Sequence, residues 1–265
     1  MGDREALLRV IIENPEPDAP RRDYARWARS VGDDYGDFIE LQLALTAKHR
    51  AHESALAWGP LWDRSEAMLE EARALWLKPF RDVLDSAVLR EPRFMRGFIE
   101  YGVFDARAFV LHAAEMYERA PILHVKLDAV VEYPQILESP FLARLVSLDM
   151  TYQGIGDEHI QRLAESPYAA RLRWLSIALN QVTQCGLEAL CASPYLKHLQ
   201  YLECGGNRFE DPTDTFGSEG EAIVFSMPTE AGTALEARHG RLEWLHAPDH
   251  FDVGFPPSFL AVEPS

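Results

Sequence analysis

The chain is short of cysteine, of cationic side chains and of long apolar runs. Its 265 residues include three cysteines, and 26 Lys and Arg stand against 42 Asp and Glu, a formal net charge of −16. An acidic chain repels phosphate groups, so nucleic acid and anionic membranes are poor partners, and a basic protein or peptide is an easier one. No apolar run approaches the ~20 residues of a transmembrane helix. The mixed-charge N-terminus is unlike a secretion signal.

The cysteines and the missing catalytic motifs narrow the function further. Cys185, Cys191 and Cys204 form an odd set without metal-ligand spacing, so we expect reduced core side chains in a cytoplasmic protein. A redox pair or metal ligation is the less favoured alternative. The sequence contains no phosphate-binding glycine loop and no G-x-S-x-G motif. It therefore predicts a protein that is not an enzyme and that uses no cofactor.

Three units of equal length follow one another in the second half of the chain. Each begins with Ser-Pro, at Ser139, Ser166 and Ser193, which are 27 residues apart. Each then carries a variant of L-x-x-L-x-L-x-x-N. The three ladders are Leu145, Leu148, Met150 and Gln153; Leu172, Leu175, Ile177 and Asn180; and Leu199, Leu202, Cys204 and Asn207. This pattern is typical of the strand segment of a leucine-rich repeat.

The repeat predicts its own architecture. Side chains alternate along a strand, so one strand cannot bury its apolar row, whereas parallel copies stacked together can. Asn at the strand end can bond backbone groups of the turn, and the amphipathic stretch that follows has room for a helix of ~2–3 turns. We predict an α/β leucine-rich-repeat solenoid over residues 93–255, with parallel strands on the concave face and helices on the convex face. The length of the units makes them similar to the ribonuclease-inhibitor class. A weak ladder from Leu242 to Ala247 would be the last strand.

The remaining segments are assigned by composition and periodicity. Residues 1–92 have helical patterning and predict a separate module, with a poorly patterned stretch at 49–60 expected to be mostly loop and a further helix starting near Glu66. Residues 210–227 are acidic and weakly patterned, which predicts a long loop. The proline-bearing segment 256–265 is expected to be a flexible tail.

Several short segments of the helical module form a spaced pattern. They are Glu5-Ala6-Leu7-Leu8, Asn14-Pro15-x-Pro17-Asp18-Ala19-Pro20-Arg21, Tyr24-Ala25-x-Trp27, Gly32-Asp33, and Gly36-Asp37-Phe38-Ile39-x-Leu41-Gln42. This pattern resembles the repeat-companion domain, a short module that is joined to leucine-rich repeats in predicted bacterial proteins. Arg26 and Asp37 depart from its usual Asp and Glu. Arg96-Gly97-Phe98-Ile99-Glu100 is similar to the junction that leads into such repeats. The resemblance implies an architecture and a binding role, but no settled activity.

On the predicted concave face, the residues that alternate away from the core form two columns. The first column holds His124, Ser147, Trp174, Tyr201 and Trp244, and the second holds Lys126, Asp149, Ser176, Glu203 and His246. Outward Trp174 and Tyr201 would be apolar anchors for a partner, and Asp149 and Glu203 would suit its Lys or Arg side chains. Alternatively, the 210–227 loop or the N-terminal module covers these aromatics and makes them core. The favoured function is a scaffold that binds a protein or peptide.

A metal-dependent enzyme or metal-binding protein is the rival interpretation. His246, Asp249, His250 and Asp252 place four potential ligands within seven residues. Imidazole and carboxylate groups suit zinc or iron. The cluster, however, lies in a stretch bounded by Pro and Gly and not on a helix that would align the two histidines, so a solvated loop is the favoured reading.

Overall fold

The computed structural model of the protein describes residues 2–51, 53–208 and 230–246. Within these ranges the chain divides into two compact units, and each is considered by itself. The first contains residues 2–102 and 114–123, and the second contains residues 103–113, 124–208 and 230–246. No helix in the described ranges is both long enough and apolar enough to cross a lipid bilayer.

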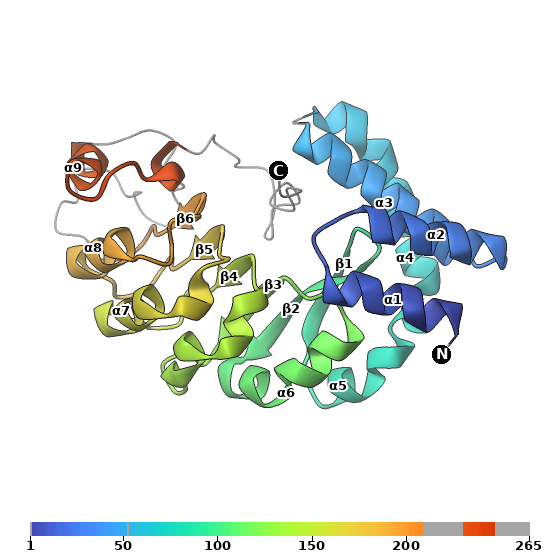
Figure 1. The fold of residues 1–265 in the computed structure, drawn as a ribbon, viewed down its shortest axis with the longest axis horizontal. Helices are drawn as coiled ribbons and strands as arrows, with labels where there is room; N and C mark the ends of the chain where they lie inside the picture. Colours follow the sequence, from blue (N-terminus) through green and yellow to red (C-terminus); the bar gives the residue numbers. More distant parts are fainter. Residues whose placement is uncertain (1, 52, 209–229, 247–265) are drawn as a thin grey trace. The chain divides into compact units, whose positions relative to one another are not determined.

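The first unit is largely helical, as the sequence predicts (Figure 1). Its helices are α1 (Asp3–Glu13), α2 (Ala19–Ser30), α3 (Tyr35–Arg50), α4 (Ala55–Trp76) and α5 (Arg81–Asp85), followed by strands β1 (Arg90–Met95) and β2 (Phe98–Asp105). Pro20 lies in the first turn of α2, where its missing N–H has no intrahelical acceptor in any case. The stretch 49–60, expected to be mostly loop, is mostly helical: α3 ends at Arg50 and α4 begins at Ala55, and Pro60 removes one backbone donor without ending α4.

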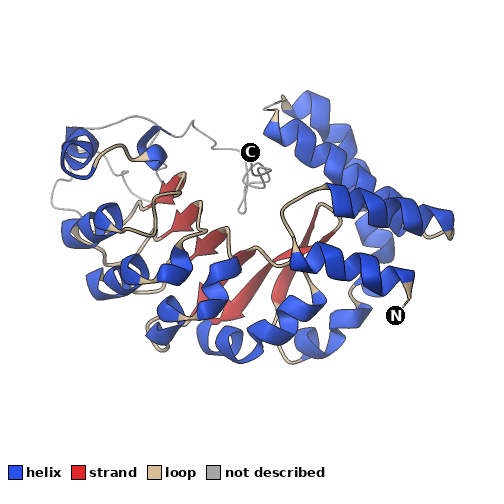
Figure 2. Cartoon of the chain, in the orientation of Figure 1, coloured by secondary structure: helices blue, strands red, loops and turns tan. Residues whose placement is uncertain are grey.

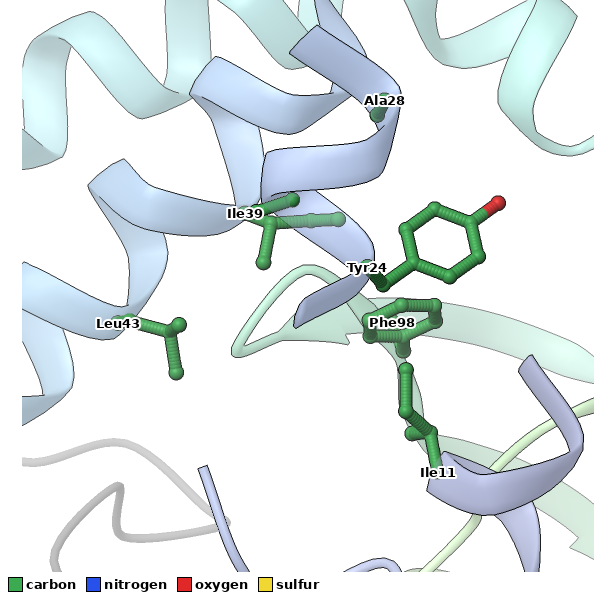
Figure 3. Close-up of a cluster of buried hydrophobic side chains, with 7 residues drawn as sticks. Ile11, Tyr24, Ala28, Ile39, Leu43 and Phe98 are labelled. Carbon is green, nitrogen blue, oxygen red and sulfur yellow. The ribbon is translucent and has the colours of Figure 1, made fainter. Parts of the chain in front are cut away.

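The core of the first unit joins three helices to strand β2. Figure 3 shows Ile11, Tyr24, Ile39 and Phe98 converging, each almost fully buried. The Tyr24 and Phe98 rings meet edge to face with centroids 5.3 Å apart, a geometry favoured by their quadrupoles. Each such side chain contributes roughly 1.5–3 kcal/mol by leaving water. This packing places β2 directly beneath α2 and α3, which positions the polar contacts described below.

The second unit contains a parallel array of short strands. The strands are β3 (His124–Asp128), β4 (Ser147–Asp149), β5 (Trp174–Ser176) and β6 (Tyr201–Glu203), which follow one another in the sheet in this order. Neighbours in the β3–β6 array pair in parallel register, with Val125, Leu148, Leu175 and Leu202 aligned and buried. The α/β class with a mostly parallel sheet is thereby confirmed.

Helices return the chain between the strands. They are α6 (Ala106–Arg119), α7 (Asp157–Glu165), α8 (Gln184–Ala192) and α9 (Glu230–His239), with short 3-10 turns at 134–138, 140–144, 167–169 and 243–246. Figure 2 shows α7 and α8 along one side of strands β4 to β6. The predicted last strand is wrong: Glu243–His246 forms a 3-10 turn, because the Leu242–Ala247 ladder has too few apolar positions to define a strand. The predicted loop 210–227 and tail 256–265 lie outside the described residues.

Asparagine side chains close the turns after β5 and β6. Asn180 Oδ1 accepts from the backbone N–H groups of Gln153 and Ile155, at 2.9 and 3.2 Å. Its Nδ2 donates to three backbone carbonyls, those of Met150, Ile177 and Ala178, at 2.8–3.0 Å. Asn207 repeats the arrangement one unit later, bonding Val182 N, Ile177 O and Cys204 O. The expected role of the repeated Asn, to satisfy backbone groups at the strand ends, is confirmed.

Candidate functional site

The second column of the predicted site lies on four adjacent strands. Lys126, Asp149, Ser176 and Glu203 are aligned by the parallel register of β3 to β6. Asp149 and Ser176 are buried, whereas Lys126 and Glu203 are half-buried. Asp149 Oδ1 accepts from the backbone N–H of Thr151 at 2.8 Å, and the hydroxyl groups of Thr151 and Ser176 are 2.7 Å apart. The column therefore offers two carboxylates on either side of a serine, fixed by short regular strands.

Neither carboxylate of this column has a counterion among the described residues. Burial raises the pKa of Glu203, and the negative charge of Asp149 raises it further, while a hydrogen bond with Ser176 opposes the shift. In the described ranges no Lys, Arg or His side chain forms an ion pair with Asp149 or Glu203, although Lys126 is the register partner of Asp149. A partly buried anion without a counterion is costly. The pair is thus suited electrostatically to a cation supplied by another molecule.

The first column does not present exposed anchors. Trp174 and Tyr201 are each 7% exposed, and Trp244 is 4% exposed. Burial raises the pKa of Tyr201 to about 12. The same column begins with a buried pair in which His124 Nδ1 and Ser147 Oγ are 2.6 Å apart. The expectation of solvent-exposed aromatics is wrong, and the alternative, in which they are buried within the chain, describes them. Trp244 also lies on the 3-10 turn and not on a strand.

Exposed apolar side chains occur instead at the turns after the strands. Tyr152 is 79% exposed and Leu179 is 49% exposed. Both adopt left-handed backbone angles, with φ of 60° and 55°, and Gly206 occupies the same position one unit later with φ of 70°. Large side chains rarely adopt this conformation, which costs about 1–2 kcal/mol per residue. The sequence does contain a signal for this conformation, because a glycine, Gly206, lies 27 residues after Leu179 at the equivalent position of the repeat. Alternation along a strand, however, does not predict whether a side chain in the following turn is exposed.

The candidate metal ligands are not brought together in the described part of the chain. His246 is exposed, and its Nε2 lies 2.8 Å from Glu236 Oε1. Asp249, His250 and Asp252 lie outside the described residues. Across residues 2–51, 53–208 and 230–246, no group of three His, Cys, Asp or Glu side chains has the geometry to hold a metal ion. Cys191 and Cys204 are buried, as expected, and burial raises the pKa of both thiols, whereas Cys185 is exposed.

A second arrangement, in the first unit, was not predicted as a site. The turn between β1 and β2 consists of Arg96 and Gly97, whose φ values of 50° and 87° match the hairpin turn with two left-handed residues. A Cβ on Gly97 would lie 2.4 Å from Ile39 Cγ1, so only glycine fits. The turn is held at both ends: Gly97 N donates to Gln42 Oε1 at 3.0 Å, and Tyr35 Oη donates to Gly97 O at 2.5 Å.

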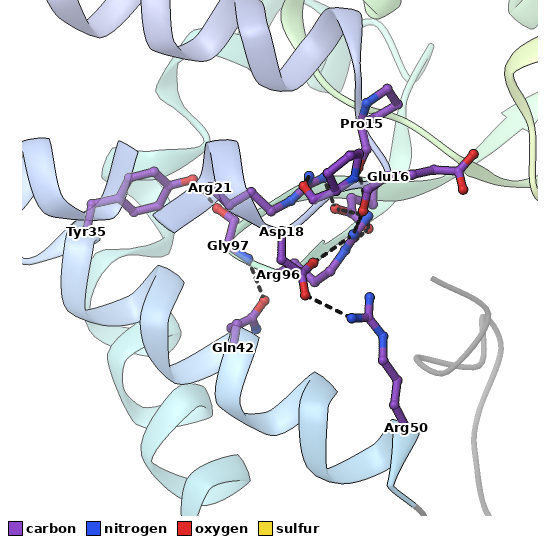
Figure 4. Close-up of polar contacts among 11 residues, drawn as sticks. Pro15, Glu16, Asp18, Arg21, Tyr35, Gln42, Arg50, Arg96 and Gly97 are labelled. Carbon is purple, nitrogen blue, oxygen red and sulfur yellow. Dashed lines mark hydrogen bonds and ion pairs between the residues drawn. The ribbon is translucent and has the colours of Figure 1, made fainter. Parts of the chain in front are cut away.

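The Arg96 side chain is the centre of a buried ion network (Figure 4). Its guanidinium bonds Glu100 at 3.0 and 3.2 Å, Asp18 at 3.1 Å, and the carbonyls of Pro15 and Glu16. Arg21 reaches the other oxygen of Glu100 and also donates to the carbonyl of Pro17 at 3.1 Å. Asp18 in turn accepts from Arg50 Nη1 at 2.8 Å. We refer to Asp18, Arg21, Arg50, Arg96 and Glu100 as the ion network.

The carboxylates and guanidinium groups of the ion network stabilise one another in their charged forms. Burial alone would raise the pKa of Asp18, but Arg96 and Arg50 outweigh it, and the pKa lies below its usual range. Burial lowers the pKa of Arg21 to about 10, although Glu100 acts in the opposite direction, so Arg21 stays charged at neutral pH. Burial also acts to lower the pKa of Arg96, but Glu100 and Asp18 reverse this effect and raise it.

The ion network gathers residues from three separated sequence segments. Asp18 and Arg21 come from the Pro-x-Asp-x-x-Pro-Arg segment, and Arg96 and Glu100 come from the Arg-Gly-Phe-x-Glu segment. Each segment can be recognised in the sequence by its own pattern. The sequence does not show that the two segments are in contact, because about 80 residues separate them. Comparison with family models, with curated proteins and with solved structures found no match.

Proposed function

We propose that the second unit is a leucine-rich-repeat array, that the first unit is a repeat-companion module, and that the chain acts as a scaffold for a basic peptide or protein segment. The repeat assignment is supported by the 27-residue spacing, the aligned leucines and the Asn side chains that close the turns. A cytoplasmic location stays a prediction from cysteine usage.

One observation carries the binding proposal: Asp149 is buried, Glu203 is half-buried, and neither has a cationic partner in the described part of the chain. A Lys or Arg side chain laid across Ser176 would approach both carboxylates, which are on β4 and β6. The exposed side chains of Tyr152 and Leu179 lie at the turns just beyond the same strands and would contact apolar groups that flank the cation. Trp174 and Tyr201 keep a supporting role, since these members of the first column are buried on β5 and β6 beside Ser176 and Glu203.

The test is a selection of peptides from a random display library against the full chain. We expect the selected peptides to be enriched in Lys and Arg relative to the library, and their affinity to fall as salt rises. Glu203→Gln and Asp149→Asn should each weaken a selected peptide by at least about tenfold, because each substitution removes one charge from a shielded ion pair. Glu158→Gln is the matched control, since Glu158 is 82% exposed on α7 and should leave the affinity unchanged.

The same variants separate loss of binding from loss of folding. Because the folded state raises the pKa of Glu203, its charged form lowers stability above the pKa of the unfolded chain, which is about 4.3. Glu203→Gln should therefore make unfolding at pH 7 slightly harder, by less than about 1 kcal/mol, while it weakens the peptide. Peptides without a basic preference, or a Glu203→Gln variant that binds as well as the native chain, would contradict the proposal.

A further inference from the structure

The ion network has an excess of positive charge. Its three guanidinium groups, on Arg21, Arg50 and Arg96, face two carboxylates, those of Asp18 and Glu100. Arg22 lies outside the network, because its side chain is half exposed and its Nη2 is 4.0 Å from Asp18 Oδ2. Figure 4 shows the carboxylate of Glu16 extending away from Arg96, which contacts only the carbonyl of Glu16. One negative charge would balance the network.

The polar atoms of Arg50 show where that charge would lie. Arg50 Nη1 donates to Asp18, whereas Nε and Nη2 are shielded from solvent and have no hydrogen-bond partner. In a guanidinium group, Nε and Nη2 carry the two parallel N–H bonds of its side edge, the arrangement that binds both oxygens of one carboxylate. Two shielded donors without an acceptor cost about 1–3 kcal/mol each.

Arg50 is also held in place for this role. It is the last residue of α3, and its bond to Asp18 is anchored by Arg96, which is itself fully buried. The Arg50 side chain keeps 21% of its surface exposed, more than Arg96 or Arg21, although its Nε and Nη2 atoms are themselves shielded. A guanidinium held by one edge loses little conformational entropy when its other edge binds.

We propose that the side edge of Arg50 is a binding site for a carboxylate group. A carboxylate is planar and carries a single negative charge, which matches both the geometry of the Nε and Nη2 donors and the excess charge of the network. This site is separate from Asp149 and Glu203 and does not depend on the binding function proposed above.

The experiment follows the Nε–H signal of Arg50 by proton–nitrogen NMR in the full chain during titration with sodium acetate. Sodium chloride at matched ionic strength and inorganic phosphate form the parallel arms. We expect a saturable shift with acetate, none with chloride, and a weaker response to phosphate. Arg50→Lys assigns the signal by removing it, because lysine keeps the charge but has no guanidinium edge. Arg22→Gln is the control and should leave the shift unchanged.

Two results would overturn the proposal. One is the absence of a saturable acetate shift at the Arg50 Nε–H, and the other is a response to phosphate that exceeds the response to acetate. The titration is made on the native chain, so it stays decisive if Arg50→Lys fails to fold, in which case Arg50→Gln supplies the assignment.

Discussion

Replacement of Asn180 by Ala should be among the most damaging single changes in the second unit. The amide of Asn180 makes five hydrogen bonds to the backbone of two successive repeat units. Alanine keeps the backbone of the turn but removes every one of these contacts. Since the side chain is buried, water does not readily replace it.

The size of the effect follows from what remains unpaired. The carbonyl of Ile177 keeps a bond from Asn207, and the carbonyl of Ala178 keeps one from Tyr152 N. Ile155 N and Met150 O are left buried without a partner, while Gln153 N is only partly buried. Two buried orphan groups at about 1–3 kcal/mol each give a loss of about 2–6 kcal/mol. That is a large part of a typical domain stability of about 5–15 kcal/mol.

Urea unfolding followed by far-ultraviolet circular dichroism would measure the loss. Asn207→Ala is the matched control, because Asn207 has the same role one unit later but makes three of these bonds instead of five, and its side chain is half-buried, so water can reach the groups that it leaves. We expect the Asn207 variant to lose clearly less stability than the Asn180 variant. A loss below about 1 kcal/mol for Asn180→Ala, or equal losses for the two variants, would refute the reasoning from orphaned backbone groups.

Two further predictions concern the ion network of the first unit. Glu100→Gln should destabilise that unit by about 3–5 kcal/mol in urea unfolding, because Arg21 and Arg96 would remain buried with one counter-charge fewer. The control is Asp23→Asn, which removes an exposed ion pair and should change stability by less than about 1 kcal/mol. Similar losses for the two variants would contradict the argument. Because Arg96 and Arg50 hold the pKa of Asp18 below its unfolded value of about 3.9, its stabilisation is present above that pH and is lost as the pH falls through the lower folded value. Thermal midpoints measured from pH 7 to pH 3 should therefore fall less steeply at the acid end in Asp18→Asn than in the native chain, and parallel curves would count against it.

Much of the fold could be predicted because its repeats are periodic. The strands β4, β5 and β6 lie within the leucine ladders, and Asn180 and Asn207 bond the backbone as expected. The prediction of a last strand was wrong, and it rested on the weakest part of the pattern, Leu242 to Ala247. Periodicity reports burial on one face of an element, so it loses force where few apolar positions remain.

The candidate site was predicted less well, because alternation gives the direction of a side chain but not what covers it. The column that holds Asp149, Ser176 and Glu203 is aligned as expected. Trp174 and Tyr201 alternate along their strands with the aligned leucines and are nevertheless buried. Exposure depends on contacts between residues far apart in sequence, and these are not encoded in a local pattern.

The buried carboxylates of the two units differ in one respect that bears on function. Glu100 is fully buried and is met by two guanidinium groups, so its desolvation is offset inside the chain. Asp149 and Glu203 are also shielded, yet in the described residues no cation meets them, and burial and mutual repulsion raise the pKa of Glu203. A fold that needed these acids only for structure would be more stable with neutral side chains there. A carboxylate that is paired within the chain, such as Glu100, fits a structural role that joins separate segments. A pair of carboxylates without a counterion in the described residues, such as Asp149 and Glu203, fits a surface that binds a cationic partner. For this reason we propose that recognition occurs on the strands of the second unit, and that the ion network, apart from the side edge of Arg50, holds the first unit together.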